Sequence, residues 1–160
     1  MGLFRKTASS TRYPILRQVQ FLAPLSAHEC ALFAQNLDRR TYAPGEWVFH
    51  QGYPQVVLYI VAEGEVEVVL EGEREQAVDT LPPGAFFGET GLFVESTRTA
   101  GVRAKEPTTL LAMSQQDFRH FVQLNPRAGA KLLYGLGKRL SELLVRNNEA
   151  RATQGEDTPA

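Results

Sequence analysis

The chain of 160 residues has one cysteine, Cys30, and this scarcity excludes two kinds of structural cross-link. One thiol cannot form an internal disulfide, and no other cysteine is present to join it in a metal cluster. The fold must therefore depend on a hydrophobic core, which 43% hydrophobic residues can supply for a single domain of this length. The low cysteine content also favours a reducing compartment.

Long apolar runs are missing as well. No segment approaches the ~20 apolar residues of a membrane-spanning helix, and the N-terminus lacks the apolar core of a secretion signal. We therefore expect a soluble, cytoplasmic protein that does not contact a membrane.

The common catalytic motifs are absent. Metal-dependent enzymes with a jelly-roll fold need two or three histidines that converge from neighbouring strands. The three histidines here, His28, His50 and His120, fall in a helix cap, at a strand end and on a late helix. The chain also has no nucleophile elbow, zinc-binding helix motif or P-loop. We expect no catalysis, no metal and no cofactor.

Positive charge is scarce in the middle of the chain. Residues 1–45 carry six basic and two acidic groups, residues 46–100 two and ten, and residues 101–160 nine and six. So acidic a middle segment cannot hold DNA by counterion release, and we expect no direct contact with nucleic acid. Arg98 stands among these acids with Arg74 as the only other cation.

Short strand patterns occupy this acidic middle. Alternating apolar residues, separated by glycine and proline turns, predict strands at residues 40–42, 47–50, 56–62, 65–70, 76–81, 99–104 and 108–113. About eight short strands at such regular spacing indicate a mainly β (α+β) fold, an eight-stranded antiparallel jelly-roll β-barrel.

Helix signals flank the strands on both sides. Residues 15–22 are typical of a short helix, and a capping box at residues 26–29 opens a second one. After the strands, Ser114 caps a further helix, and an Asn-Pro pair opens a longer helix over residues 125–148. The barrel should therefore carry N-terminal and C-terminal helices.

The two ends of the chain lack hydrophobic periodicity. Residues 1–14 are polar and basic, and we interpret them as a mobile arm. Residues 150–160 are mostly small or acidic and are expected to be a disordered tail. The domain itself then spans residues 15–149.

The predicted long helix carries an apolar seam with spacings of three and four residues. The seam consists of Leu133, Leu136, Leu140 and Leu143. It could pack on its own barrel or on the same helix of a second chain, and we favour a homodimer through the C-terminal helix. Gly135 and Gly137 weaken an isolated helix but would permit close approach of a neighbour.

The segment 87–100 contains the strongest signal of a site. Gly88 and Gly91 have no Cβ, so a ligand can approach the backbone, and a helical turn starting near Glu89 would present N–H groups to an anion. Arg98 could bind two oxygens of the same anion with its planar guanidinium. Glu89 suits a sugar hydroxyl and could pair with Arg98 until the ligand arrives. The pattern predicts a site for an anionic sugar phosphate.

At these residues the sequence resembles the phosphate-binding cassette of the cyclic nucleotide-binding domain family. The matching residues are Phe87, Gly88, Glu89, Gly91, Leu92, Arg98, Thr99 and Ala100. The resemblance extends over residues 21–144 and includes the order of helices and strands. One departure is Thr97, which stands where proline often precedes the arginine.

The resemblance implies a regulatory module that binds cAMP or cGMP. The cyclic nucleotide would be held by Gly88, Glu89, Thr90, Gly91, Arg98, Thr99 and Ala100. Within this set, Arg98 and the amides of residues 88–90 would bind the cyclic phosphate, while Glu89 would accept the ribose 2′-hydroxyl.

The resemblance also implies that the C-terminal helix moves toward the barrel when ligand binds. Leu143 and Leu144 correspond to the lid over the purine and can offer only an apolar cap. Discrimination between adenine and guanine would then fall mainly to the hydroxyl of Thr99. We therefore expect both nucleotides to bind with modest selectivity.

The sequence also fits a second kind of module. A degenerate barrel could keep the fold and act as a nucleotide-independent dimerisation or protein-interaction module, because fold alone does not decide function. Gly88 and Gly91 could then be simple turn glycines, and Glu89 and Arg98 a surface ion pair. The effector protein is unknown in either case, and the chain could be a free-standing sensor or a domain cut from a longer protein.

Overall fold

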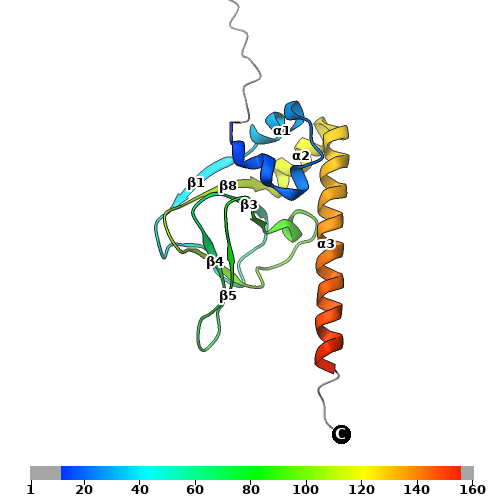
Figure 1. The fold of residues 1–160 in the computed structure, drawn as a ribbon. Helices are drawn as coiled ribbons and strands as arrows, with labels where there is room; N and C mark the ends of the chain where they lie inside the picture. Colours follow the sequence, from blue (N-terminus) through cyan, green and yellow to red (C-terminus); the bar gives the residue numbers. More distant parts are fainter. Residues whose placement is uncertain (1–11, 156–160) are drawn as a thin grey trace, which may run out of the picture.

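Eight antiparallel strands form two four-stranded sheets in the computed structural model, which describes residues 12–155 (Figure 1). The strands are β1 Asp38–Tyr42, β2 Trp47–Phe49, β3 Val57–Glu63, β4 Val66–Leu70, β5 Gln76–Leu81, β6 Phe86–Phe87, β7 Gly101–Ala104 and β8 Thr108–Ser114. The first sheet has the order β1-β8-β3-β6, and the second has the order β2-β7-β4-β5. The predicted jelly roll with flanking helices is confirmed.

The central strand β3 separates two hydrophobic cores by its alternation. Leu58 and Ile60 belong to a core that the first sheet shares with the helices. Tyr59 and Val61 belong to a second core, which lies between the sheets and also contains Phe49 and Phe87. Because successive side chains of a strand point to opposite faces, one strand can serve both cores. The candidate site borders the second core.

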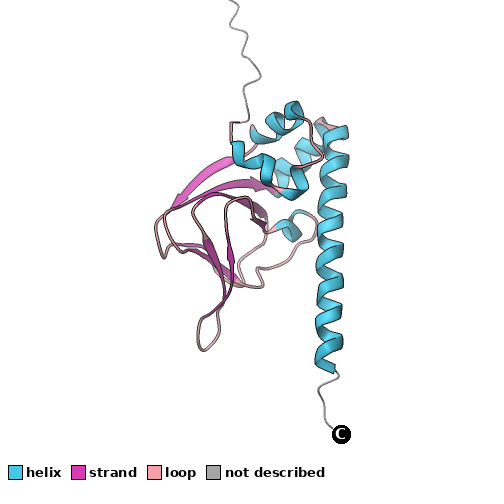
Figure 2. Cartoon of the chain, viewed as in Figure 1, coloured by secondary structure: helices cyan, strands magenta, loops and turns pink. Residues whose placement is uncertain are grey.

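The helices gather at one end of the barrel and along one side of it (Figure 2). They are the 3₁₀ helices η1 Pro14–Gln18 and η2 Gln20–Leu22 and the α-helices α1 Ala27–Ala34, α2 Gln115–Leu124 and α3 Pro126–Gly155. At the start of α1, Ser26 N donates to Glu29 Oε1 at 2.9 Å, and Glu29 N donates to Ser26 Oγ at 3.1 Å. Ser114 Oγ accepts from Asp117 N at 3.0 Å. Both predicted caps are confirmed.

The helix α3 continues past its predicted end near residue 148. It reaches Gly155, so residues 150–155, which we predicted to be the start of a disordered tail, are helical. This segment contains good helix formers and no proline, and Thr153 Oγ1 donates to Ala150 O at 2.9 Å. The remainder of the predicted tail, and the predicted arm up to residue 11, lie outside the described residues.

The predicted leucine seam does not form one continuous face. Leu136 is fully buried in the core together with Leu132, which the seam omits. Leu133 is exposed, while Leu140 and Leu143 are half-buried. The buried face follows the i, i+4 spacing because α3 packs on η2 and α2 near its N-terminal end. The homodimer remains a prediction.

Gly135 explains how closely η2 approaches this helix. A Cβ built there would lie 3.0 Å from Phe21 O and 3.2 Å from Phe21 Cα. The close neighbour that we expected for the glycine is therefore a segment of the same chain. Gly137, by contrast, has no atom within 4 Å of a Cβ position.

The contact between α1 and α3 leads to a prediction about acid stability. Lys131 Nζ lies 2.6 Å from Glu29 Oε1 and, with the Ser26 N–H, lowers the pKa of Glu29 from 4.5 to about 2. A group with a depressed pKa stabilises the fold above its unfolded pKa, and this contribution is lost as the pH falls through the folded value. Glu29→Gln should therefore lower the melting temperature at neutral pH, and the difference from wild type should shrink between pH 4.5 and about 2.

Thermal melts across this pH range check the prediction. Glu149→Gln, on an exposed part of α3, serves as the control and should leave the wild-type profile unchanged. A constant difference between Glu29→Gln and wild type down to pH 2 would contradict it.

Candidate functional site

The predicted helical turn is present at the start of the cassette. Glu89–Leu92 form the 3₁₀ helix η3, and Gly88 precedes it with φ 82° and ψ 13°. This left-handed conformation favours glycine. A Cβ on Gly88 would also lie 2.5 Å from both Arg98 Nη1 and Val57 O. Gly88 therefore allows the turn and the arginine to lie against each other.

Arg98 is buried beneath this turn, with 5% of its surface exposed. Its Nη2 donates to Val57 O at 2.9 Å, and its guanidinium carbon lies 4.0 Å from the ring centroid of Phe49. Its Nε is buried and has no hydrogen-bond partner among the described residues. Burial lowers the pKa of Arg98, which the charge of Glu89 partly opposes. A buried cation with unused donors is costly, and a bound anion would relieve that cost.

The backbone of Arg98 is fixed by the connection between β2 and β3. Gly52 N donates to Arg98 O at 2.8 Å, and Arg98 N donates to Tyr53 O at 2.8 Å. Pro54 and Thr97 form an antiparallel bridge one step further on. Two short segments that belong to neither sheet therefore pair with each other and hold the arginine in place.

A pocket of about 130 Å³ opens in front of the guanidinium. Its lining comprises Phe49, Gln55, Val68, Phe87, Gly88, Arg98, Thr99, Ala100 and Val102. Most of the lining is aromatic or aliphatic, and Arg98 is its one charged group. Such a pocket suits a ligand with an apolar part and a single anionic group.

The structure brings four of the predicted site residues together at this pocket: Gly88, Arg98, Thr99 and Ala100. Thr90 is exposed at the surface of the turn. Gly91 packs closely on the β2–β3 connection, because a Cβ there would lie 2.7 Å from the carbonyl carbon of Gln55. Its contact with a ligand stays a prediction.

Glu89 differs from the prediction. It is half-buried at the first position of η3, but no ion pair joins it to Arg98 within residues 12–155. The guanidinium instead donates to Val57 O and lies over the Phe49 ring, two contacts that do not require a carboxylate. The carboxylate oxygens of Glu89 are thus left for another partner.

The predicted purine lid is not part of this pocket. Leu143 is half-buried and Leu144 is 63% exposed, and neither lines the pocket. The lid therefore stays a prediction that concerns the state with ligand bound.

Several residues of the pocket were missed by sequence reasoning. Phe49 could have been found, because it takes the inward position of a predicted strand. The carbonyl of Val57 carries no sequence signal, since any residue would supply one. Gln55 is recognised only through its proximity to Gly91 and Ser96.

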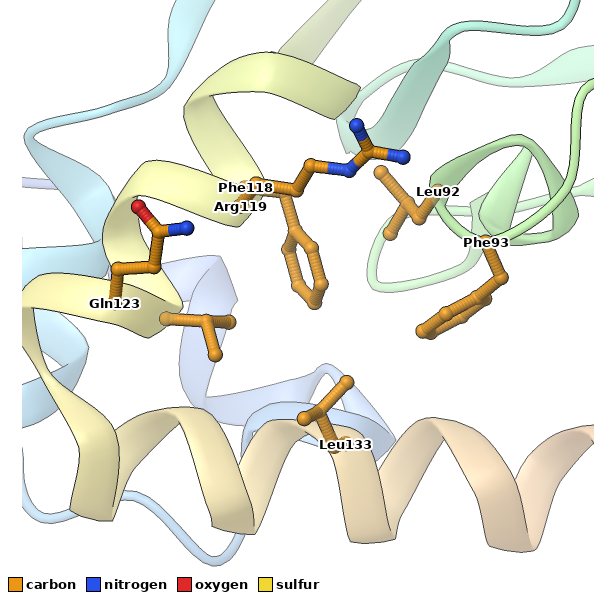
Figure 3. Close-up of a pocket in the computed structure, with 7 residues that line it drawn as sticks. Leu92, Phe93, Phe118, Arg119, Gln123 and Leu133 are labelled. Atoms are coloured by element: carbon orange, nitrogen blue, oxygen red, sulfur yellow. The ribbon is translucent and has the colours of Figure 1, made fainter.

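A larger groove lies beside the cassette, between η3, α2 and α3. It measures about 320 Å³ and is lined by Leu92, Phe93, Phe118, Arg119, Val122, Gln123 and Leu133. Figure 3 shows Leu92 and Phe93 on one side, with Phe118 and Leu133 facing them. The rings of Phe93 and Phe118 meet edge to face with centroids 6.2 Å apart. The groove therefore joins the cassette to both C-terminal helices.

Two further features are absent from the described part of the chain. No helix there is long and apolar enough to cross a membrane. Residues 12–155 also contain no group of three or more His, Cys, Asp or Glu side chains placed to hold a metal ion. His50, one of the three histidines, lies 2.7 Å from Glu71 through its Nδ1 atom.

Known proteins share both the sequence pattern and the fold of this chain. The Cyclic AMP receptor protein of Thermus thermophilus is 34% identical over 120 residues, which cover 74% of this chain and 56% of that protein. Among solved structures, the N-terminal domain of a transcriptional regulator from Streptomyces coelicolor superposes with a TM-score of 0.75 at 29% identity, covering 81% of this chain and 94% of the other.

A third relative was solved together with a nucleotide. The regulatory domain of Toxoplasma gondii PKA, in co-crystals with cAMP, gives a TM-score of 0.67 at 26% identity and covers 81% of this chain and 48% of the other. The present chain spans only between 26% and 56% of the length of four curated relatives that it matches. The profile of the cyclic nucleotide-binding domain matches residues 39–125, which hold the cassette and most of both sheets. With the jelly roll, the cassette turn and the buried arginine all in place, the chain belongs to the cyclic nucleotide-binding domain family.

Proposed function

We propose that this chain is a sensor module that binds cAMP or cGMP in the pocket in front of Arg98. The observation that carries the proposal is the buried guanidinium, which lines the pocket and keeps its Nε without a partner among the described residues. A cyclic phosphate carries one negative charge and can accept from a guanidinium and from backbone amides together. A relative named as a cyclic AMP receptor and another solved with cAMP support this ligand class.

The sugar would lie beside the cassette turn. Glu89 begins η3 next to Gly88 and is half-buried, so its carboxylate can accept a hydrogen bond at the edge of the pocket. A 3′,5′-cyclic nucleotide has a free ribose 2′-hydroxyl, which is a suitable donor for this group. We assign Glu89 to that hydroxyl.

Calorimetric titration of the protein with cAMP and cGMP tests the proposal. Both nucleotides should release or absorb heat and raise the melting temperature, because a ligand that binds only the folded state stabilises it. Acyclic 5′-AMP is the control, since its phosphate carries a second charge and its 3′-hydroxyl is free. If neither cyclic nucleotide gives heat or a melting shift at millimolar concentration, the module is a nucleotide-independent barrel.

Ligand binding would be coupled to α3 through the groove. Phe93 follows η3 directly and contacts Phe118 on α2, which in turn packs on α3. A shift of the cassette on phosphate binding would therefore press on both helices. Only a closed state buries the purine, so the ligand would draw α3 toward the barrel, and a partner protein in the cytoplasm could sense this movement.

Two substitutions separate the lid from base selection. Leu144→Ala should weaken cAMP and cGMP by similar factors, each about three- to tenfold, because an apolar cap stabilises any purine by area burial. Thr99→Ala should change the ratio of the two affinities, since Thr99 lines the pocket and its hydroxyl would contact phosphate and base. Competition binding with a fluorescent analogue measures both. Unchanged affinities for Leu144→Ala would show that α3 does not cover the purine.

A further inference from the structure

Glu71 makes three hydrogen bonds across a turn that lies outside the cassette. The residue follows β4 directly, in the connection to β5. Its Oε1 lies 2.7 Å from His50 Nδ1, and its Oε2 accepts from Gln51 N at 2.6 Å. In return, Glu71 N donates to Gln51 Oε1 at 2.9 Å. One carboxylate therefore ties the β4–β5 connection to residues 50 and 51.

These two residues begin the connection that surrounds Arg98. Tyr53 N donates to His50 O at 3.2 Å, so the chain turns immediately after the Glu71 contacts. The two backbone bonds from this turn to Arg98, through Gly52 and Tyr53, follow within three residues. At the two ends of the connection, the Phe49 ring and Val57 O contact the guanidinium. Backbone and side chain of Arg98 thus depend on one short segment.

The surroundings of Glu71 favour a fixed carboxylate. The hydrogen bonds from His50 and Gln51 lower the pKa of Glu71, so that the group stays ionised and keeps both acceptors. Its side chain is 25% exposed. Trp47 stacks on the His50 ring with centroids 4.3 Å apart, and a Cβ on Gly101 would lie 2.7 Å from both Trp47 and Glu71. The close packing leaves the carboxylate little freedom to swing away.

We propose that Glu71 is a positioning residue of the nucleotide site, which it serves without touching the ligand. Its carboxylate holds residues 50 and 51, the turn that they start holds the backbone of Arg98, and the guanidinium is thereby aimed at the phosphate. The effect of Glu71 on nucleotide affinity rests on the proposed function. Its effect on the position of Arg98 rests on the geometry alone. A binding group held by a second layer of hydrogen bonds needs little reorganisation when the ligand arrives.

The test compares Glu71→Ala and Glu71→Gln with Glu73→Ala, an exposed neighbour in the same connection. Calorimetry with cAMP should show roughly tenfold weaker binding for Glu71→Ala, because its loss frees both hydrogen-bond donors of the turn. Glu71→Gln keeps one acceptor oxygen for the Gln51 N–H and should restore part of the affinity. Glu73→Ala should bind like the wild type.

Amide hydrogen exchange in the protein without ligand provides the second measurement. Glu71→Ala should speed exchange of the Arg98 and Gly52 amides about tenfold or more, while amides of β3 such as Ile60 keep their wild-type rates. Equal acceleration at all three amides would mean a general loss of stability and would overturn the positioning role. Wild-type affinity in Glu71→Ala would overturn it as well. If the wild type itself binds no cyclic nucleotide, the proposed function fails, and the exchange rates still decide whether Glu71 positions Arg98.

Discussion

Arg98→Ala is expected to weaken binding of cAMP and cGMP by at least about 30-fold. Removing one partner of a desolvated, hydrogen-bonded charge pair costs about 2–5 kcal/mol, and each 1.4 kcal/mol corresponds to roughly a factor of ten. Without ligand, the same substitution should cost little stability, because removing a cation that is 5% exposed and has an unpartnered Nε among the described residues offsets the lost hydrogen bond to Val57 O. Calorimetry and melting curves measure the two effects separately.

Two further variants test whether binding needs the guanidinium at position 98 and not simply a positive charge. Arg98→Lys keeps the charge but loses the planar pair of donors, so its affinity should fall between those of wild type and Arg98→Ala. Arg74→Ala removes the other cation of residues 46–100, which is exposed, and should leave affinity unchanged. Wild-type affinity in Arg98→Ala, or an equal loss in Arg74→Ala, would show that the phosphate is bound elsewhere.

Gly91→Ala is expected to destabilise the fold by about 1–3 kcal/mol, the usual cost of overpacking a tight contact. The new Cβ would overlap the backbone of Gln55, 2.7 Å from its carbonyl carbon, and neither segment can move without the other. For a chain of this size the melting temperature should fall by about 3–10 °C. Affinity should fall too, since Gln55 lines the pocket and η3 carries Glu89.

Gly137→Ala is the matched control, because it makes the same chemical change at a helical glycine with open space around it. Alanine is the better helix former, so this variant should be more stable than wild type by about 0.5–1 kcal/mol. Chemical denaturation of wild type, Gly91→Ala and Gly137→Ala measures their free energies of unfolding. If Gly91→Ala matches or exceeds wild-type stability, close packing on Gln55 is not what requires the glycine.

The features that could be predicted from the sequence are those set by neighbouring residues. The caps at Ser26 and Ser114 depend on a side chain three residues away, and both form as expected. Strand alternation located seven of the eight strands, while β6, with two residues, is too short to show a pattern. The cassette turn was predictable because its glycine, carboxylate and arginine lie within one short segment.

The features that could not be predicted depend on distant parts of the chain. Gly91 packs against Gln55, and Arg98 donates to a carbonyl 41 residues away. The choice of Leu132 over Leu133 as a buried residue is decided by where η2 lies, because both leucines fit a helical seam. Glu71 is one of ten acidic residues between positions 46 and 100, and its role is visible only in the hydrogen bonds between the β4–β5 connection and the β2–β3 connection.

The uneven burial of α3 has a mechanical consequence. Its fully buried residues end at Leu136 and its half-buried ones at Leu143, although the helix runs on to Gly155. The part beyond Leu143 is therefore a stiff arm of about 18 Å at 1.5 Å per residue, which is held only at its inner end. A tilt of about 10° at that end would carry the tip through about 3 Å. If the cassette shifts slightly and tilts α3, the C-terminal end of the helix would thus move further than the cassette does, but with less force.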